Sequence, residues 1–191
     1  MQTTICIEMS ILIGCVKMYI LKEDLSARDF ILQGFLELLK IKQSCEITVT
    51  EIVEKAGVSR STFYIHFKDK YDLIDYLRDD ITSKLLAFYE KNDEDSPSSI
   101  KGITLKICEH IYAYRHFYRH EFNDPYFVQM LSYRLSEKLY SAFSDRGYAI
   151  FASHGTIGYL AYWVKEDYQM NPDEVAGQLA KIGITDWSRG N

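Results

Sequence analysis

The sequence has few residues that interrupt helices, with 3 prolines and 10 glycines among its 191 residues. Proline removes a backbone donor and glycine loses much conformational freedom on folding, so both are uncommon inside long helices. Apolar residues recur three and four positions apart through most of the chain, and alternating runs are few. These features argue against a sheet-based protein and predict an all-α fold.

Cysteine is also scarce, and its spacing indicates no particular chemistry. The four cysteines form no CxxC pair, which argues against both a zinc site and a disulfide framework. We interpret them as reduced, buried thiols of a cytoplasmic protein. They are Cys6, Cys15, Cys45 and Cys108.

The sequence lacks an apolar run that could cross a bilayer. The run at 9–16 falls far short of the ~20 residues that a membrane helix needs. A secretory signal would begin with basic residues and end at a small-residue cleavage site, and neither is present. We therefore expect no membrane partner. Residues 1–21 are expected to be an N-terminal extension from a misassigned start, with Met18 close to the true start and 1–17 dispensable.

Positive charge is lacking overall, because 27 acidic residues outnumber 22 basic ones and give a formal net charge of −5. Proteins that hold nucleic acid over their whole surface are usually basic. Residues 55–70 are an exception, with four basic residues against one acidic residue, a local charge of +3. Any nucleic-acid contact is therefore expected at this patch. Its charged residues are Lys55, Arg60, Lys68, Asp69 and Lys70.

The same stretch carries the pattern of a helix-turn-helix. A short helix at 50–56 stops at a glycine, and Ser59 can cap a second short helix at 60–67. Phe63 and Phe67 stand four apart, so they share the face that packs inward. The second helix then turns its polar residues toward solvent, where they suit a DNA major groove. These outward residues are Arg60, Ser61, Thr62, Tyr64 and His66.

The helical pattern extends on both sides of this motif. A helix over 26–40 precedes it, and a connecting helix over 70–90 follows it. The acidic, hydroxyl-rich stretch 91–99 is expected to be a linker. We predict a helix-turn-helix DNA-binding domain over 22–70 and a helical regulatory and dimerisation domain over 71–191. Helices of the second domain are expected at 99–120, 125–145, 148–169 and 172–186.

The segment 48–74, TVTEIVEKAGVSRSTFYIHFKDKYDLI, resembles the N-terminal DNA-binding domain of the TetR family of bacterial regulators. The likeness extends over roughly 24–78, and many positions agree at fixed spacing across three helices. Ile65 departs from the pattern, since relatives often have a polar or basic residue there. By position, the resemblance implies contacts to the DNA backbone or its phosphates from Thr48, Tyr64, His66 and Lys70. It implies contacts to bases or nearby phosphates from Arg60, Ser61 and Thr62, and we count the capping Ser59 among the DNA-binding residues.

The resemblance also implies a homodimer on a near-palindromic duplex, because family regulators pair through their last two long helices. A repressor released by a small-molecule effector is the expected mode, and an activator of the same fold is the alternative. Stretches 123–131 and 155–179 resemble a subgroup that includes regulators of dihydroxyacetone-kinase operons. The expected interface residues, with an internal core as the alternative, are Gly155, Gly158, Leu160, Val164, Val175, Leu179 and Ile182.

The C-terminal half combines aromatic rings with a few polar tips, which is the usual make-up of a small-molecule pocket. A tyrosine-rich core whose hydroxyls find backbone partners is an equal alternative. The pocket candidates are His110, Tyr114, Phe117, Tyr118, Phe127, Met130, Tyr133 and His154.

A metal-dependent helical enzyme is the alternative from a different functional class. His116 and His120 stand four apart, which suits a metal site on one helix face. The sequence has no HExxH motif, no closely spaced Cys/His dyad and no glycine-rich phosphate loop to support catalysis. We therefore predict no enzyme activity, no catalytic residue, no metal and no cofactor.

Overall fold

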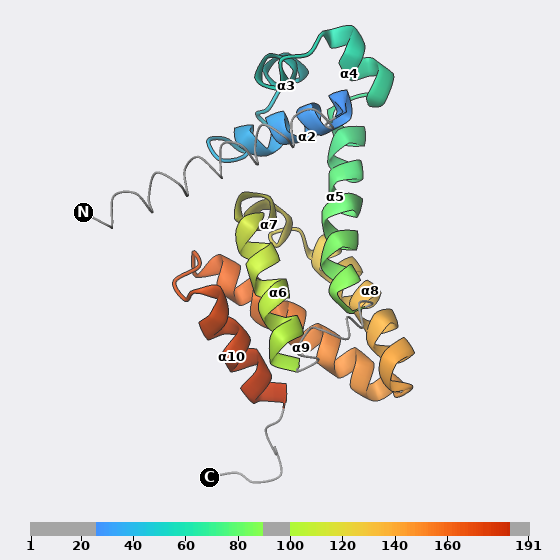
Figure 1. Cartoon of the computed structure of the whole chain (residues 1–191), viewed down its shortest axis with the longest axis vertical. Helices are drawn as coiled ribbons and strands as arrows, with labels where there is room; N and C mark the ends of the chain where they lie inside the picture. Colours follow the sequence, from blue (N-terminus) through green and yellow to red (C-terminus); the bar gives the residue numbers. More distant parts are fainter. Residues whose placement is uncertain (1–25, 90–99, 184–191) are drawn as a thin grey trace, which may run out of the picture. The chain divides into compact units, whose positions relative to one another are not determined.

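The computed structural model describes residues 26–89 and 100–183, and every regular element in these ranges is a helix (Figure 1). The expected all-α fold is confirmed. The predicted extension at 1–21 and the linker at 91–99 lie outside the described residues. The chain divides into two compact units, and the boundary falls between Ile74 and Asp75. We call the described residues before this boundary the N-terminal unit and those after it the C-terminal unit; the domain limits expected from the sequence stay a prediction.

The N-terminal unit contains α2 (Ala27–Leu38), α3 (Val49–Ala56), α4 (Arg60–His66) and the start of α5 (Lys70–Leu86). Each helix contributes fully buried apolar side chains to one small core. These are Ile31 and Phe35 of α2, Ile52 of α3, Phe63 of α4 and Leu73 of α5.

Helices α2 and α3 approach each other closely at Gly34, which is buried. A Cβ added there would lie 3.1 Å from the backbone nitrogen of Ala56 and 3.2 Å from the carbonyl oxygen of Ile52. Glycine at this position therefore sets how tightly α3 lies on α2.

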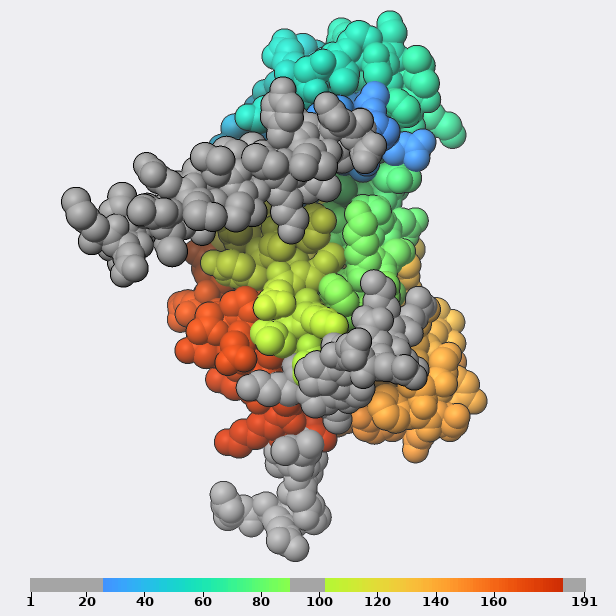
Figure 2. Space-filling model, viewed as in Figure 1, coloured from blue at the N-terminus to red at the C-terminus, as the bar shows by residue number. Residues whose placement is uncertain are grey.

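The C-terminal unit begins inside α5, which ends at Leu86 and continues as a 3-10 turn, η1 (Ala87–Tyr89). The remaining helices are α6 (Ile100–Ala113), α7 (Arg115–Glu121), α8 (Pro125–Phe143), α9 (Arg146–Lys165) and α10 (Pro172–Gly183). Helix α8 packs along α9, and α10 packs along α6, beside which it lies in Figures 1 and 2. Trp163 is fully buried in α9, and its indole Nε1 donates to the carbonyl of Met170, 2.9 Å away, before α10 begins.

The prediction of one helix over 99–120 is wrong. The chain breaks at Tyr114, where φ is −100° and ψ is 28°, so α6 and α7 are separate helices. The hydroxyl of Tyr168 donates to the carbonyl oxygen of Arg115, 2.9 Å away, and stabilises the chain beside this break. Apolar spacing runs through the break unchanged, which is why the sequence pattern did not reveal it.

Two further expectations concern cysteine and the membrane. Cys108 is buried as expected, but Cys45 is exposed in the loop between α2 and α3, so the expectation of burial is wrong for Cys45. Among the residues that the structure describes, no helix combines the length and apolarity that a membrane span requires.

Candidate nucleic-acid interface

Helix α4 is held by two phenylalanines and turns its opposite face to solvent. Phe63 is fully buried and Phe67 is 3% exposed, with ring centroids 5.8 Å apart. Tyr64 is 55% exposed and Ile65 is 77% exposed, and Ser61 lies on the same outer side. Ser61 and Tyr64 therefore face solvent, as expected from the sequence.

The turn before α4 depends on a backbone conformation that favours glycine. Gly57 ends α3 with φ 68° and ψ 28°, in the left-handed region. The amide of Val58 then donates to the carbonyl of Val53, 3.1 Å away, which closes the end of α3.

The hydroxyls of Ser59 and Thr62 stabilise the start of α4. The Ser59 oxygen accepts a hydrogen bond from the amide of Thr62 at 3.0 Å, and the two hydroxyl oxygens lie 2.8 Å apart. This is a side-chain N-cap, which typically contributes about 1 kcal/mol to helix stability. The expected DNA roles of these two residues stay a prediction.

Arg60 is exposed at the first position of α4, and its guanidinium contacts α3. Its Nη2 donates to the hydroxyl oxygen of Thr50 at 3.0 Å. The contact links the two helices of the motif and keeps the cation near the start of α4. His66 is partly buried in the last turn of the same helix.

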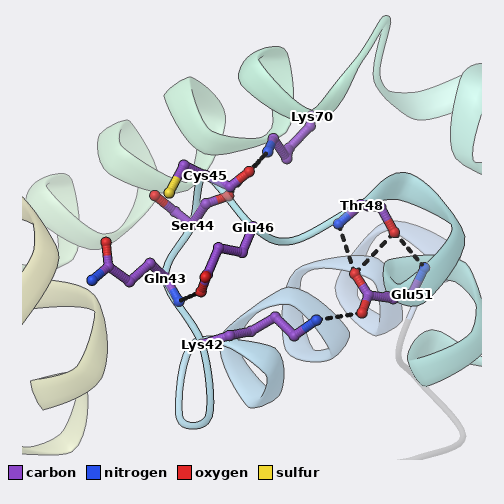
Figure 3. A network of polar contacts seen from close by, with 8 residues as sticks. All are labelled: Lys42, Gln43, Ser44, Cys45, Glu46, Thr48, Glu51 and Lys70. Atoms are coloured by element: carbon purple, nitrogen blue, oxygen red, sulfur yellow. Dashed lines mark hydrogen bonds and ion pairs between the residues drawn. The ribbon is translucent and has the colours of Figure 1, made fainter.

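Thr48 begins α3 through a reciprocal cap with Glu51 (Figure 3). The Thr48 hydroxyl accepts from the amide of Glu51 at 3.3 Å, and the Thr48 amide donates to the Glu51 carboxylate at 2.9 Å. Lys42 also pairs with this carboxylate. The hydrogen bond from Lys42, followed by those from Thr48, lowers the pKa of Glu51 to about 2. The expected contact of Thr48 with DNA stays a prediction.

Lys70, an expected phosphate contact, bonds within its own unit. Its Nζ donates to the carbonyl oxygens of Ser44 and Cys45, each at 3.0 Å (Figure 3). The Asp69 carboxylate accepts from the amides of Tyr71 and Asp72 at 2.7 and 2.9 Å. The start of α5 is thus capped by an acid, which disfavours the phosphate that we expected there. The phosphate role of Lys70 itself stays a prediction.

In the C-terminal unit, five of the expected pocket residues form one aromatic cluster. The His110 ring lies 4.9 Å from the Tyr114 ring and 6.0 Å from the Tyr118 ring, and Phe117 lies 6.2 Å from Phe127. Phe88 and Phe122 join this cluster and were missed, although Phe122 stands four residues after Tyr118. We call these seven residues the aromatic cluster.

Two polar atoms of the aromatic cluster are buried without a hydrogen-bond partner among the described residues. They are Nε2 of His110 and the hydroxyl oxygen of Tyr118. Burial lowers the pKa of His110 to about 4 and raises that of Tyr118 well above its ordinary value, so both side chains are neutral at pH 7. A buried polar group without a partner costs about 1–3 kcal/mol, so these atoms favour a bound hydrogen-bonding group.

The other expected pocket residues lie elsewhere. Tyr133 is 60% exposed, and His154 is exposed with its Nδ1 2.9 Å from the carbonyl of Ile150. Including them was wrong, because their sides of α8 and α9 face away from the core. Met130 is partly buried, and its place in the pocket stays a prediction.

A cleft of about 310 Å³ lies on the C-terminal unit; Phe122 of the aromatic cluster lines it, but none of the expected pocket residues does. Its lining combines the buried Phe122 and Val164 with charged and polar side chains. Two of the charged side chains, Arg119 and Asp167, pair with each other. The polar lining residues are Arg119, Asn123, Lys165 and Asp167.

The predicted dimer stripe is wrong for its most apolar members. Leu160 and Val175 are fully buried and Val164 is 3% exposed, so they belong to the core of their own subunit. Leu179 is partly buried, whereas Ile182 is 40% exposed. The alternative of an internal core was therefore correct for the first three.

The exposed side of α9 carries a different stripe, in which sequence reasoning included Gly155 and Gly158 but missed the aromatic residues. Phe151 is 71% exposed and Tyr162 is 53% exposed. Gly155 and Gly158 lie between them, and a Cβ added at either glycine would meet nothing within 4 Å. These four residues, with the 45% exposed Tyr148, recur three and four apart, so they share one face. We call these five residues the α9 outer stripe.

The acid that follows His120 in the sequence, Glu121, already pairs with Arg78 and gives the metal-site alternative no support. Glu121 is 6% exposed, and its carboxylate accepts from Nε of Arg78 at 2.5 Å. Among the residues that the structure describes, no group of three or more His, Cys, Asp or Glu side chains is arranged to hold a metal ion. His116 and His120 therefore have no supporting ligands in the described parts of the chain.

Sequence comparison matches both units to known families. Residues 46–77 match the family described as bacterial regulatory proteins, tetR family, and residues 98–184 match one described as transcriptional regulator C-terminal region. The uncharacterised HTH-type transcriptional regulator YxbF of Bacillus subtilis is 24% identical over 171 residues. That match covers 82% of this chain and 44% of YxbF, so the chain spans less than half the length of this relative.

Solved structures share the fold. A transcriptional regulator of the TerR/AcrR family from Aquifex aeolicus has a TM-score of 0.64 at 19% identity, over 82% of this chain and 96% of its own. The dihydroxyacetone kinase operon activator DhaS has a TM-score of 0.61 at 15% identity, over 82% and 93%. At these identities the likeness establishes the fold alone, so the dihydroxyacetone-kinase subgroup stays a prediction.

Proposed function

The chain belongs to the TetR family of bacterial transcriptional regulators, and from this premise we propose that it is a homodimeric repressor of a near-palindromic operator. Regulators of this family bind DNA and act as dimers, and they are not enzymes. The metal-dependent enzyme with His116 and His120 is therefore set aside.

The orientation of α4 is the observation that carries operator binding. Phe63 and Phe67 fix one side of the helix in the core, which leaves Ser61 and Tyr64 free to meet base edges or phosphates. A helix of this width fits the major groove. The +3 charge of residues 55–70 supplies the attraction to phosphate that an otherwise acidic protein needs.

The α9 outer stripe supports the homodimer. Soluble monomers rarely leave a contiguous apolar patch of aromatic side chains exposed. The two open glycines let a second α9 approach closely, while Phe151 and Tyr162 supply apolar area on either side of them. Two subunits related by a two-fold axis would present two copies of α4, which is why the operator is expected to be near-palindromic.

The aromatic cluster supports regulation by a small molecule. His110 and Tyr118 are both neutral and each has one buried polar atom to satisfy, so a neutral ligand with a hydroxyl or carbonyl group fits better than an ion. Rings from five other residues would surround the apolar part of such a ligand. Its binding would shift the subunit toward a conformation that leaves the operator.

Selection of bound sequences from random duplex DNA tests operator binding and dimer symmetry together. The full chain is expected to enrich one near-palindromic sequence. Enrichment without two-fold symmetry would contradict the dimeric arrangement, and no enrichment would contradict operator binding. The selected site is then placed in a reporter promoter, where expression should fall; a rise would identify an activator.

Release from the selected site tests the effector. A panel of neutral alcohols and ketones is screened for compounds that lower operator affinity, and hits are repeated on Tyr118→Phe. Arg119→Ala is the matched control, since Arg119 lines the cleft and is not a member of the aromatic cluster. The proposal expects Tyr118→Phe to lose the response and Arg119→Ala to keep it. If Arg119→Ala loses the response and Tyr118→Phe keeps it, the effector binds in the cleft and the proposal is wrong.

A further inference from the structure

Ile65 occupies the centre of the outer face of α4. It is 77% exposed, the largest value among the bulky apolar side chains that the structure describes. Ser61 stands one helical turn earlier on the same face, and the buried Phe63 lies on the opposite side. Ile65 is therefore directed away from the N-terminal unit and toward whatever α4 contacts.

Folding gives no reason for an isoleucine here. β-branched residues are weaker helix formers than alanine, arginine or lysine, and α4 has only 7 residues. A side chain with this exposure gains little from packing against its own unit.

Within α4, Arg60 carries the one permanent charge, and its guanidinium donates to Thr50 of α3. Ser61 and Tyr64 bring hydroxyls to the face that carries Ile65. The outer face of α4 thus presents methyl groups flanked by hydroxyls.

We propose that Ile65 contacts the C5-methyl group of a thymine in each half-site of the operator. In the major groove, thymine is the base that presents a methyl group, and the other base edges present hydrogen-bond donors and acceptors. Isoleucine can neither donate nor accept, so the base edge that it favours is the methylated one. This inference rests on the proposed binding of operator DNA by α4.

Replacement of thymine by deoxyuridine tests the contact, because it removes the methyl group and leaves base pairing intact. Each thymine of the selected operator is replaced in turn, in one half-site and then in both. Affinities are measured for the wild type, Ile65→Ala and Ile41→Ala. Ile41 is the matched control, because it is 76% exposed in the same unit and lies outside α4. Circular dichroism checks that each variant is folded.

At one thymine position per half-site, deoxyuridine should weaken wild-type binding about fourfold, and about fifteenfold when both half-sites are changed, as expected for one buried methyl-sized group. Ile65→Ala should bind both duplexes equally, and Ile41→Ala should keep the wild-type ratio. If the wild type prefers its operator but no deoxyuridine weakens it, or if Ile65→Ala keeps the sensitivity, the thymine contact is wrong and operator binding stands. If the wild type selects no operator, both proposals fail.

Discussion

The two units orient their helices by different means. In the N-terminal unit, side-chain caps at Thr48 and Ser59 and the left-handed Gly57 define where each short helix begins or ends. In the C-terminal unit, α9 is apolar on several sides, and packing decides that Leu160 is buried while Phe151 is 71% exposed. Local signals can be recognised in a sequence, whereas the outcome of a competition between two apolar faces cannot.

The difference extends to what each unit exposes. Helix α4 turns hydroxyls and one isoleucine outward, near a basic patch, which suits a polar, charged partner such as DNA. Helix α9 turns aromatic rings and glycines outward, which suits a second copy of the same apolar surface. Charge should therefore disrupt the outer stripe of α9 most strongly.

The largest effect is expected from Phe151→Glu combined with Tyr162→Glu. The proposed interface of the dimer would then bury four carboxylates without partners. An uncompensated charge left in a buried contact costs about 3–5 kcal/mol. The dimer dissociation constant should rise at least about 100-fold, and operator affinity should fall with it. Sedimentation velocity measures the oligomeric state.

Tyr126→Glu is the matched control for this pair, because Tyr126 is 74% exposed on α8 and lies outside the stripe. It should leave the oligomeric state unchanged. A double variant that sediments as the wild type does would place the interface elsewhere.

Glycine-to-alanine substitutions should have opposite effects in the two units. Gly34→Ala places a Cβ 3.1 Å from the Ala56 nitrogen, so it should lower the free energy of unfolding by about 1–3 kcal/mol. Gly158→Ala meets nothing within 4 Å, so helix propensity should raise that free energy by about 1 kcal/mol. Urea unfolding of Gly158→Ala in the background of Phe151→Glu and Tyr162→Glu separates subunit stability from dimerisation. An equal loss of unfolding free energy in Gly34→Ala and Gly158→Ala would contradict the finding that the outer face of α9 is open at Gly158.

Two tyrosines of the C-terminal unit should respond oppositely to loss of the hydroxyl. Tyr118 has a buried hydroxyl without a partner among the described residues, so Tyr118→Phe should raise the free energy of unfolding by about 1–2 kcal/mol. The Tyr168 hydroxyl donates to the carbonyl of Arg115, so Tyr168→Phe should lower it by about 1 kcal/mol. Thermal and urea unfolding measure both. Destabilisation by Tyr118→Phe would show that its hydroxyl is satisfied after all.

Two pH dependences are expected, one from each unit. Burial lowers the pKa of His110 from 6.5 to about 4 in the folded protein. As pH falls, the imidazole of His110 is therefore protonated in the unfolded chain before it is protonated in the folded protein. The stability that neutral His110 contributes is present above pH 6.5 and is lost as pH falls toward 4. The hydrogen bond from Lys42 lowers the pKa of Glu51 from 4.5 to about 2, so its contribution is present above pH 4.5 and is lost as pH falls toward 2.

Urea unfolding across pH 7 to 3 distinguishes the two groups. His110→Leu should flatten the dependence between pH 6.5 and 4, and Glu51→Gln should flatten it below pH 4.5. Variants whose pH profiles match that of the wild type would contradict these assignments.

The sequence predicted the elements of the N-terminal unit almost completely, because each end has its own cap or glycine. It indicated the cap at Ser59, whereas the DNA roles expected of Thr48, Ser59 and Thr62 involve the same hydroxyl oxygens and stay predictions. In the C-terminal unit it found the rings of the aromatic cluster but added Tyr133 and His154, whose helix faces point outward. For the interface it chose the exposed Gly155 and Gly158 together with the buried Leu160 and Val164, because periodicity does not tell an apolar core from an apolar surface.

The most direct test of α4 as a DNA reader is a titration of the full chain on its selected duplex and on a scrambled duplex of the same composition. Measurements at about 50 and 200 mM salt include the phosphate contribution. The proposal predicts at least about 10³-fold tighter binding to the selected duplex, and affinity for both duplexes that falls steeply as salt rises. Equal affinity for the two duplexes at both salt concentrations would contradict it.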